Sequence, residues 1–272
     1  MERMVNIGLL QFKAKLGDVK YNVEHAVDMI KEAAKEGAQI VCLPELFATG
    51  YNLQILEEKT LTLGFEYFEY IKEEMSKAAK MNQVYVIAPT VEIRDLAKIG
   101  YNSALMFSDE GELVGSFAKS HVWALEGVYF REGNEYPVFE TKYGKIGIMI
   151  CYDSGFPEAC RSLTLNGAEI VFIPSAWRIE DMDMWDLNVP QRALENLLFT
   201  VGVNMVSKEE NLQLFGKSKV CNPRGTIVKE LPMDQESCAV VSIDLNEVRK
   251  YRDEIPYLRD RKPSIYGKII EL

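Results

Sequence analysis

The sequence predicts an α/β fold in which one strand–helix–strand unit is used twice. Apolar segments of strand length alternate with segments of helical periodicity along the 272-residue chain. The segment GAQIVCLPEL at 37–46 matches GAEIVFIPSA at 167–176, and NIGLLQF at 6–12 echoes KIGIMIC at 145–151. Short apolar strands that follow Gly-Ala also resemble one another by chance, so the repeat is a prediction for the structure to test.

The first unit begins at 5–12 with an apolar segment rich in branched side chains, which is typical of a buried strand. Apolar side chains then recur at helical spacing over 22–36, and Gly37 is expected to end that helix. Asp109-Glu110-Gly111 predicts a hairpin turn between two strands. The other elements expected here are a strand at 39–46, a helix at 64–82 and strands at 84–90, 102–108 and 112–118.

The second unit begins with an apolar strand from Lys145 to Cys151, followed by a helix that opens at Phe-Pro-Glu. The elements expected after the strand are a helix at 156–166, a strand at 169–176, a helix at about 189–199, a strand at 200–206 and short strands within 216–243. No low-complexity linker divides the two halves. We therefore expect a single domain over 1–272, with 245–272 as a C-terminal tail.

The composition limits the possible classes of function. The net charge of −10 argues against nucleic acid and anionic membranes as partners, and no apolar run approaches the roughly 18 residues of a spanning helix. The N-terminus lacks the pattern of a signal peptide, which predicts a cytoplasmic protein. An odd number of cysteines without Cys-x-x-Cys spacing argues against a disulfide framework and a zinc site. These cysteines are Cys42, Cys151, Cys160, Cys221 and Cys238.

Cys151 stands where a buried strand meets a helix, and Glu45 ends a strand in the other half. Active groups collect at the carboxyl ends of strands in such sheets, so these two side chains are expected to converge. A free thiol has a pKa of about 8.5 and needs a base or a nearby cation to react. Glu45 is the better base and Lys119 a candidate cation, although each alone is also explained as a strand-end charge. His25 and His121 are expected to be structural, and a Cys–His pair is the weaker alternative.

Three segments, LPELFATGY, FAKSHVWALEG and GIMICYDSGFPEACR, resemble in that order the three motifs of the nitrilase superfamily of carbon–nitrogen hydrolases. PSAWRIED, QRALENLLFTVGVN, FGKSKVCNPRGTIV and YLRDRKPSIYG resemble later landmarks of the family, so the resemblance extends over about 4–267. It implies a four-layer α-β-β-α sandwich with internal pseudo-two-fold symmetry. It also implies Glu45 as general base, Lys119 as stabiliser of the oxyanion and Cys151 as nucleophile, with no metal or organic cofactor.

The resemblance also implies a second glutamate that orients Lys119. By spacing this is Glu126, with Glu132 as the alternative, and the backbone N–H of Tyr152 would be the second oxyanion donor. We expect Cys42, Cys160, Cys221 and Cys238 to be packing residues. Glu158 and Arg161 are expected to form an ion pair that supports the turn at Cys151, or else a surface pair.

Nitrilases in this family usually carry Trp-Glu after the cysteine, whereas this chain has Tyr152-Asp153, as in the amidase and carbamoylase branches. The resemblance therefore favours hydrolysis of a small amide or N-carbamoyl compound, through a thioester, by a homodimer or larger homo-oligomer. A nitrilase, an acyl-transferring relative and a non-catalytic scaffold are the alternatives. Ser154-Gly155 departs from the family pattern, and Gly155 lacks a side chain that would fill the pocket. Candidates for substrate contact are Tyr51, Trp123, Trp177 and Arg178. The aromatics are equally explained as core residues. Arg178 is a candidate to hold a substrate carboxylate and is equally explained as a solvated side chain.

Overall fold

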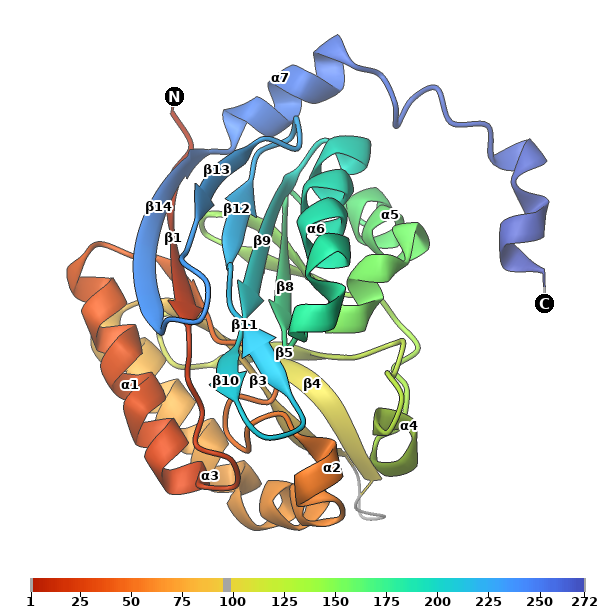
Figure 1. Ribbon diagram of the computed structural model, residues 1–272. Helices are drawn as coiled ribbons and strands as arrows, with labels where there is room; N and C mark the ends of the chain where they lie inside the picture. The colour runs from red at the N-terminus through yellow and green to blue at the C-terminus, as the bar shows by residue number, and fades with distance from the viewer. Residues whose placement is uncertain (1, 95–98, 272) are drawn as a thin grey trace.

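Two six-stranded mixed sheets form the centre of the computed structural model, which describes residues 2–94 and 99–271 (Figure 1). The first sheet has the order β14 (Ser237–Asp244), β1 (Met4–Gln11), β2 (Ile40–Cys42), β3 (Tyr85–Arg94), β4 (Ile99–Phe107) and β5 (Leu113–Ala118). The second has the order β6 (Val138–Thr141), β7 (Gly144–Ile148), β8 (Ile170–Ser175), β9 (Phe199–Asn204), β12 (Lys219–Cys221) and β13 (Ile227–Glu230).

The two sheets have the same pattern of parallel and antiparallel strand pairs, which confirms the predicted internal repeat. In the first sheet β14–β1 is antiparallel, β1–β2 and β2–β3 are parallel, and β3–β4 and β4–β5 are antiparallel. In the second sheet the corresponding pairs from β6 to β13 follow the same pattern. The segments 6–12 and 145–151 thus contain equivalent parallel strands, so their likeness in sequence reflects pseudo-two-fold symmetry.

Helices cover the outer faces of both sheets and complete the predicted α-β-β-α sandwich (Figure 1). The helices α1 (Val19–Lys35) and α3 (Lys59–Asn82) pack on the first sheet through an apolar cluster that includes Val23, Ile30 and Ile71. The helices α5 (Pro157–Leu165) and α6 (Met182–Asn196) cover the second sheet. A larger apolar cluster joins the inner faces of the two sheets and extends to the side chains of α5 and α6. Burial of this apolar surface drives the layers together.

Several predicted bounds were wrong for identifiable reasons. The helix expected at about 189–199 is α6, which begins at Met182 and includes Pro190 in its interior; a proline there removes one intrahelical hydrogen bond without ending the helix. The strand expected at 39–46 is paired only over Ile40–Cys42, because Pro44 and a turn follow. The strand expected to end at Cys151 ends at Ile148, and Cys151 opens the 3₁₀ turn η1 (Cys151–Gly155). The hairpin turn at 109–111 is confirmed, with Gly111 at a φ of 83°.

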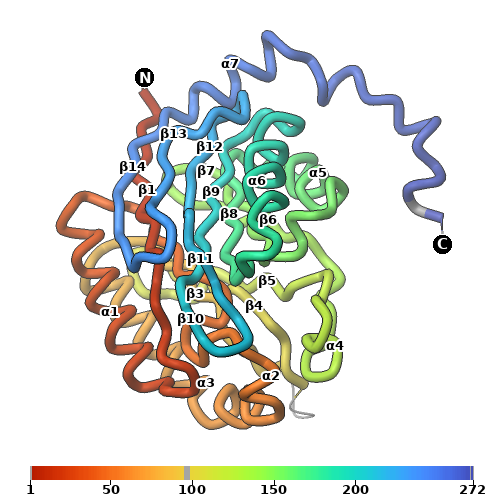
Figure 2. The backbone as a smooth tube through the Cα atoms, in the orientation of Figure 1, coloured from red at the N-terminus to blue at the C-terminus, as the bar shows by residue number. Residues whose placement is uncertain are grey.

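The remaining elements are short, and most of them lie near the ends of the sheets. They are α2 (Leu53–Leu56), α4 (Glu126–Tyr129), the turn η2 (Ile179–Asp181), the hairpin β10 (Val206–Lys208) and β11 (Gln213–Phe215), α7 (Asn246–Glu254), η3 (Pro263–Ile265) and η4 (Gly267–Ile270). After α7 the chain extends away from both sheets (Figure 2). The predicted tail at 245–272 thus contains α7, while Leu272 lies outside the described residues.

Candidate active site

Glu45, Lys119 and Glu126 form a buried charge cluster beyond the ends of two strands of the first sheet. Glu45 follows β2, Lys119 follows β5, and Glu126 is the first residue of α4. The Lys119 Nζ lies 2.7 Å from Glu45 Oε1 and 2.7 Å from Glu126 Oε1, and all three side chains are fully buried. Glu132, the alternative to Glu126, is exposed. The structure therefore brings together the two glutamates and the lysine that the motif order predicts.

The electrostatics of this cluster keep Lys119 charged and make Glu45 more basic. Burial alone would lower the pKa of Lys119, but the carboxylates of Glu126 and Glu45 more than offset this, so the pKa of Lys119 is raised. Burial raises the pKa of the Glu45 carboxyl, and Lys119 offsets only part of that effect. A carboxylate with a raised pKa takes a proton more readily near neutral pH.

Hydrogen bonds to one oxygen of the Glu45 carboxylate hold this side chain in place. Its Oε1 accepts hydrogen bonds from Lys119 Nζ and, at 2.8 Å, from Asn102 Nδ2 on β4. Its Oε2 is buried and has no hydrogen-bond partner within residues 2–94 and 99–271. The Cys151 thiol is close enough to lower the pKa of the same carboxyl slightly. The geometry thus leaves one carboxylate oxygen available to accept a proton from a group in the adjoining cavity.

Glu126 is held by two further donors. The Tyr51 hydroxyl donates a 2.5 Å hydrogen bond to Glu126 Oε1, and the backbone N–H of Trp123 donates to Glu126 Oε2 at 3.1 Å. Burial and the Glu126 carboxylate raise the pKa of Tyr51 well above its usual value, so the phenol keeps its proton and acts as the donor. These bonds fix the carboxylate that contacts Lys119.

Cys151 lies on a strained turn that points its side chain out of the strand. Its φ is 50°, a left-handed conformation that costs on the order of 1 kcal/mol for a residue with a side chain. The thiol is only 7% exposed. Burial, and then the Glu45 carboxylate, raise the pKa of Cys151 well above its usual value, and Lys119 lowers it only in part. The resting side chain is therefore a thiol, which needs a base to become a nucleophile.

Asp153 fastens this turn to the neighbouring loop. Its Oδ2 accepts from the backbone N–H of Ile150 at 3.0 Å, and its Oδ1 accepts from the backbone N–H of His121 at 2.9 Å. The His121 ring places Nδ1 2.7 Å from the same oxygen and stacks on Phe156 with a centroid distance of 3.7 Å. His121 therefore supports the turn through Asp153, consistent with its predicted structural role.

The expected ion pair between Glu158 and Arg161 does not support this turn. Arg161 Nη2 instead donates to the backbone oxygen of Glu195 at 2.7 Å. The turn is held by Arg192 of α6, whose Nε donates to the backbone oxygen of Ser154 at 2.9 Å. Arg192 also forms an ion pair with Glu195. The error arose because sequence proximity favoured a partner within α5, whereas the packed helix α6 supplies the guanidinium.

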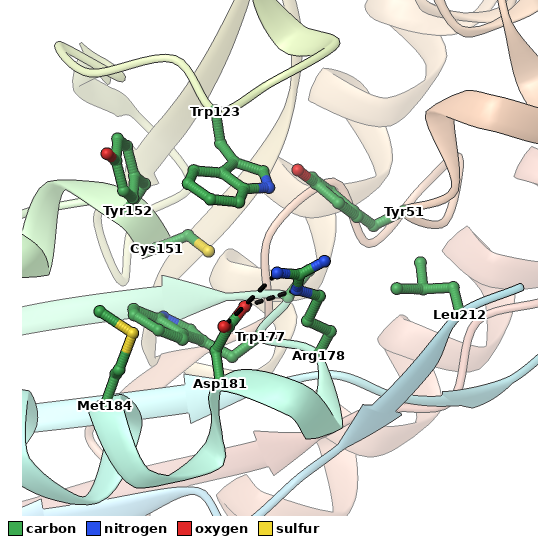
Figure 3. A pocket seen from close by; sticks show the side chains of 10 residues that line it. Tyr51, Trp123, Cys151, Tyr152, Trp177, Arg178, Asp181, Met184 and Leu212 are labelled. Atoms are coloured by element: carbon green, nitrogen blue, oxygen red, sulfur yellow. Dashed lines mark hydrogen bonds and ion pairs between the residues drawn. The ribbon is translucent and has the colours of Figure 1, made fainter.

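A cavity of about 100 Å³ opens above the Cys151 sulfur (Figure 3). Four aromatic side chains line it, namely Tyr51, Trp123, Tyr152 and Trp177. Ala176, Asp181, Met184 and Leu212 form other parts of its walls. Arg178 also lines the cavity, but its Nε donates to Asp181 Oδ2 at 2.5 Å. All four residues predicted to contact substrate therefore line the cavity, and the Arg178 charge is already paired there. Gly155 does not line it, and a Cβ at Gly155 would meet nothing within 4 Å.

Sequence reasoning missed Asn102 and Asp181. Asn102 is a fully buried amide within β4, and a polar residue in such a strand is the signal that could have drawn attention to it. Asp181 follows Arg178 by three residues in PSAWRIED, a spacing that brings side chains together on a helical turn. Neither pattern identifies the partner of the side chain without the tertiary structure.

The cysteines other than Cys151 lie outside this cavity. Cys42, Cys160 and Cys221 are buried, and Cys238 is partly exposed. Burial raises the pKa of Cys160 to about 12 and those of Cys221 and Cys238 to about 11. These thiols stay protonated and, unlike Cys151, do not line the cavity beside Glu45, which supports their predicted role in packing.

The carbon–nitrogen hydrolase family matches residues 6–253. The chain belongs to the carbon–nitrogen hydrolase family. This hydrolase is 34% identical to a nitrilase of Pyrococcus abyssi, over 97% of this chain and 99% of the relative. It is 30% identical to a 2-oxoglutaramate amidase of Bacillus subtilis, over 96% and 98% of the two chains. A solved carbon–nitrogen hydrolase from Helicobacter pylori G27 superposes with a TM-score of 0.93 at 30% identity, over 99% of each chain.

The hydrolase therefore has the predicted fold and belongs to the predicted superfamily. Within residues 2–94 and 99–271, no helix is both long and apolar enough to cross a membrane. In the same residues, no group of three or more His, Cys, Asp or Glu side chains is arranged to hold a metal ion.

Proposed function

We propose that this hydrolase cleaves the C–N bond of a small amide or N-carbamoyl compound through a thioester on Cys151. The observation that carries the proposal is the buried Glu45–Lys119–Glu126 cluster with a free carboxylate oxygen beside a protonated thiol. A scaffold protein has no use for this arrangement, because burying three charged side chains costs free energy unless their interactions repay it.

In the first half of the reaction, Glu45 takes the thiol proton as the Cys151 sulfur attacks the carbonyl carbon. The carbonyl electron pair moves to the oxygen, and the resulting oxyanion is stabilised by the charged Lys119 and by the backbone N–H of Tyr152. Tyr152 is in the first turn of η1, where backbone N–H groups have no intrahelical partner. Glu45 then gives its proton to the nitrogen, the C–N bond breaks and ammonia or an amine leaves.

In the second half, Glu45 takes a proton from a water molecule that attacks the thioester carbon. The tetrahedral intermediate uses the same oxyanion donors and collapses with loss of the thiolate, which recovers a proton from Glu45. A carboxylic acid or carbamic acid is released. Glu126 does not exchange protons in this scheme. It positions Lys119, and Tyr51 and the Trp123 N–H position Glu126 in turn.

The proposal favours amides over nitriles because Tyr152-Asp153 follows the cysteine. Attack on an amide produces an oxyanion, whereas attack on a nitrile produces a thioimidate nitrogen that must be protonated, and one site does not stabilise both equally. Hydrolysis of nitriles is the second candidate, because a relative at 34% identity carries the name nitrilase.

Paired amides and nitriles with the same side chain test the proposal. We expect kcat/KM to favour the amide of each pair by at least tenfold, or about 1.4 kcal/mol of transition-state stabilisation. Ammonia release and acid formation should be equimolar for the amides. A tenfold preference for nitriles would assign the second candidate function and leave the roles of Glu45, Lys119 and Cys151 in place.

A further inference from the structure

The Cys151 cavity adjoins a second cavity of about 200 Å³. Four residues form walls of both, namely Tyr51, Trp123, Arg178 and Leu212. A substrate with its carbonyl at the Cys151 sulfur can therefore extend past these residues with the part that remains bonded to the carbonyl. What the second cavity offers determines which groups that part can carry.

The charges of the side chains that line the two cavities add up to a negative value. Arg178 is the cation among the described lining residues, and both its Nε and its Nη2 face the Asp181 carboxylate, at 2.5 and 3.5 Å. Glu180, the neighbour of Asp181 on η2, lines the second cavity. It is exposed and forms no ion pair with any described residue. One guanidinium is thus set against two carboxylates, and a substrate carboxylate would have to displace Asp181 to reach Arg178.

The walls of the first cavity suit a cation for a second reason. Aromatic faces attract positive charge, by about 0.5–2 kcal/mol according to how far the site excludes water. Tyr51, Trp123, Tyr152 and Trp177 surround the space above the thiol (Figure 3). The Trp123 ring already lies 5.8 Å from the Arg178 guanidinium carbon. Neutral apolar groups also fit such walls, but a carboxylate gains nothing from them.

A hydrogen-bonded network shapes the far wall of the second cavity. Asn52 Nδ2 donates to Asn211 Oδ1 at 2.9 Å and to the Glu209 carboxylate, and Asn211 Nδ2 donates to Gln54 Oε1 at 2.5 Å. These bonds tie the 209–212 loop to α2 and bring a further carboxylate, Glu209, beside this wall. The network uses the Asn52 and Asn211 amide donors internally, so the charge that it adds beside this wall is the negative one of Glu209.

We propose that the substrate carries a positively charged amino group on the part that remains bonded to the carbonyl, held between the aromatic walls and Glu180. This inference rests on the proposed function and adds a substrate class to it, namely amides whose acyl part carries an ammonium group and N-carbamoyl compounds that lose ammonia and keep a cationic amine on the carbonyl. It reverses the sequence-based interpretation of Arg178 as a carboxylate-binding residue, because the structure pairs Arg178 with Asp181.

Three primary amides with the same chain of four methylene groups test the proposal: 5-aminopentanamide, hexanamide and the monoamide of hexanedioic acid. They end in an ammonium, a methyl and a carboxylate group. At low ionic strength we expect kcat/KM to fall in that order, with at least about tenfold between ammonium and carboxylate. Added salt should narrow this difference, because screening weakens exposed charge interactions.

Glu180→Gln should reduce the ratio of kcat/KM for the ammonium and methyl amides about threefold, mainly through KM. Asp183→Asn is the matched control, since it removes the same charge from an exposed residue that lines neither cavity. It should leave the ratio unchanged. Equal rates for the three amides, or a preference for the carboxylate, would overturn the inference while leaving the proposed function standing. Failure of all three to react, with Cys151 unmodified, would overturn both.

Discussion

The two pseudo-symmetric halves carry different side chains at equivalent ends of their strands. Where 6–12 ends in Phe12, its counterpart 145–151 ends in Cys151. Phe12 is buried and packs at 6.1 Å against Phe47, whereas Cys151 turns into the cavity at a positive φ. The same position beyond the first parallel strand is thus used for packing in one half and for a reactive group in the other.

The second pair of equivalent positions shows the reverse arrangement. Glu45, after β2, carries a carboxylate with a free oxygen, while its counterpart Ser175 on β8 donates a local hydrogen bond to the Ile173 oxygen at 3.0 Å. Each half therefore supplies one of the two groups in the proposed proton transfer. The repeated fold thus provides the positions, and the proposed chemistry requires the two halves to differ at them.

Close packing preserves the shared frame around these different side chains. Both first strands carry a glycine at the same place: a Cβ on Gly8 would lie 2.8 Å from Val41, and one on Gly147 would lie 3.1 Å from Leu163. A larger residue at either glycine would push the strand away from its neighbours. The strand ends that carry Phe12 and Cys151 would then move as well.

The largest effect is expected from removing the thiol. Cys151→Ala should lower kcat by at least about 10⁴-fold, because the covalent step is lost. The circular dichroism spectrum and Tm should stay close to those of the parent protein. Cys238→Ala is the control, since that partly exposed thiol lies outside the cavity. Full activity in folded Cys151→Ala would remove the chemical difference between the two halves.

The next largest effect is expected at Glu45, and a much smaller one at its counterpart Ser175. Glu45→Gln and Lys119→Ala should each lower kcat/KM by about 10²- to 10⁴-fold, through loss of the base or of one oxyanion donor. Ser175→Ala should change it by less than about threefold, since its hydroxyl donates to the Ile173 oxygen of its own strand and does not line the cavity. Iodoacetamide should also alkylate Cys151 more slowly in Glu45→Gln. An unchanged alkylation rate would mean that Glu45 is not the base.

The pH profile should reflect the environment of Glu45. The reactive form needs the Glu45 carboxylate, and burial raises its pKa, so kcat/KM should fall as the pH drops through a value above that of an ordinary glutamate. Lys119 should not limit activity on the alkaline side near neutrality, because its pKa is raised. A plot of log kcat/KM against pH with an acid limb at the usual glutamate pKa would contradict this assignment.

A smaller effect is expected where Tyr51 supports the cluster without reacting. Tyr51→Phe removes the 2.5 Å hydrogen bond to Glu126 and keeps the ring in the cavity wall. We expect kcat to fall by about tenfold, in keeping with the loss of one hydrogen bond to a charged group. A loss as large as that of Lys119→Ala would place Tyr51 in the chemical step itself.

Much of the fold follows from local patterns in the sequence. The alternation of apolar strands with helical periodicity, together with the repeated segments, predicts the two units that β1–β2 and β7–β8 confirm. The bounds of α6 could not be predicted in this way, because contacts with the second sheet keep Pro190 within the helix against its local preference. The ends of β2 and β7 depend likewise on where partner strands stop pairing.

In the candidate site too, the sequence predicts some features and leaves others open. The resemblance of the ordered motifs to those of the nitrilase superfamily predicts that Glu45, Lys119, Glu126 and Cys151 belong together, and the strand-end positions of Glu45 and Cys151 agree with it. The pairing of Arg178 with Asp181, of Asn102 with Glu45 and of Arg192 with the Ser154 oxygen depends on side-chain directions. Those directions are set by packing between elements, which a single sequence does not specify.

The most direct test of the central claim is the mass of the enzyme quenched in acid during turnover of a small amide. It should be measured for the parent protein and for Glu45→Gln, in which slower activation of water prolongs the thioester. We predict that the peptide containing Cys151 gains the mass of the acyl group, and that neutral hydroxylamine removes it. Continued turnover by the parent protein with no added mass on Cys151 in either protein, or with the acyl group on another residue, would contradict the account.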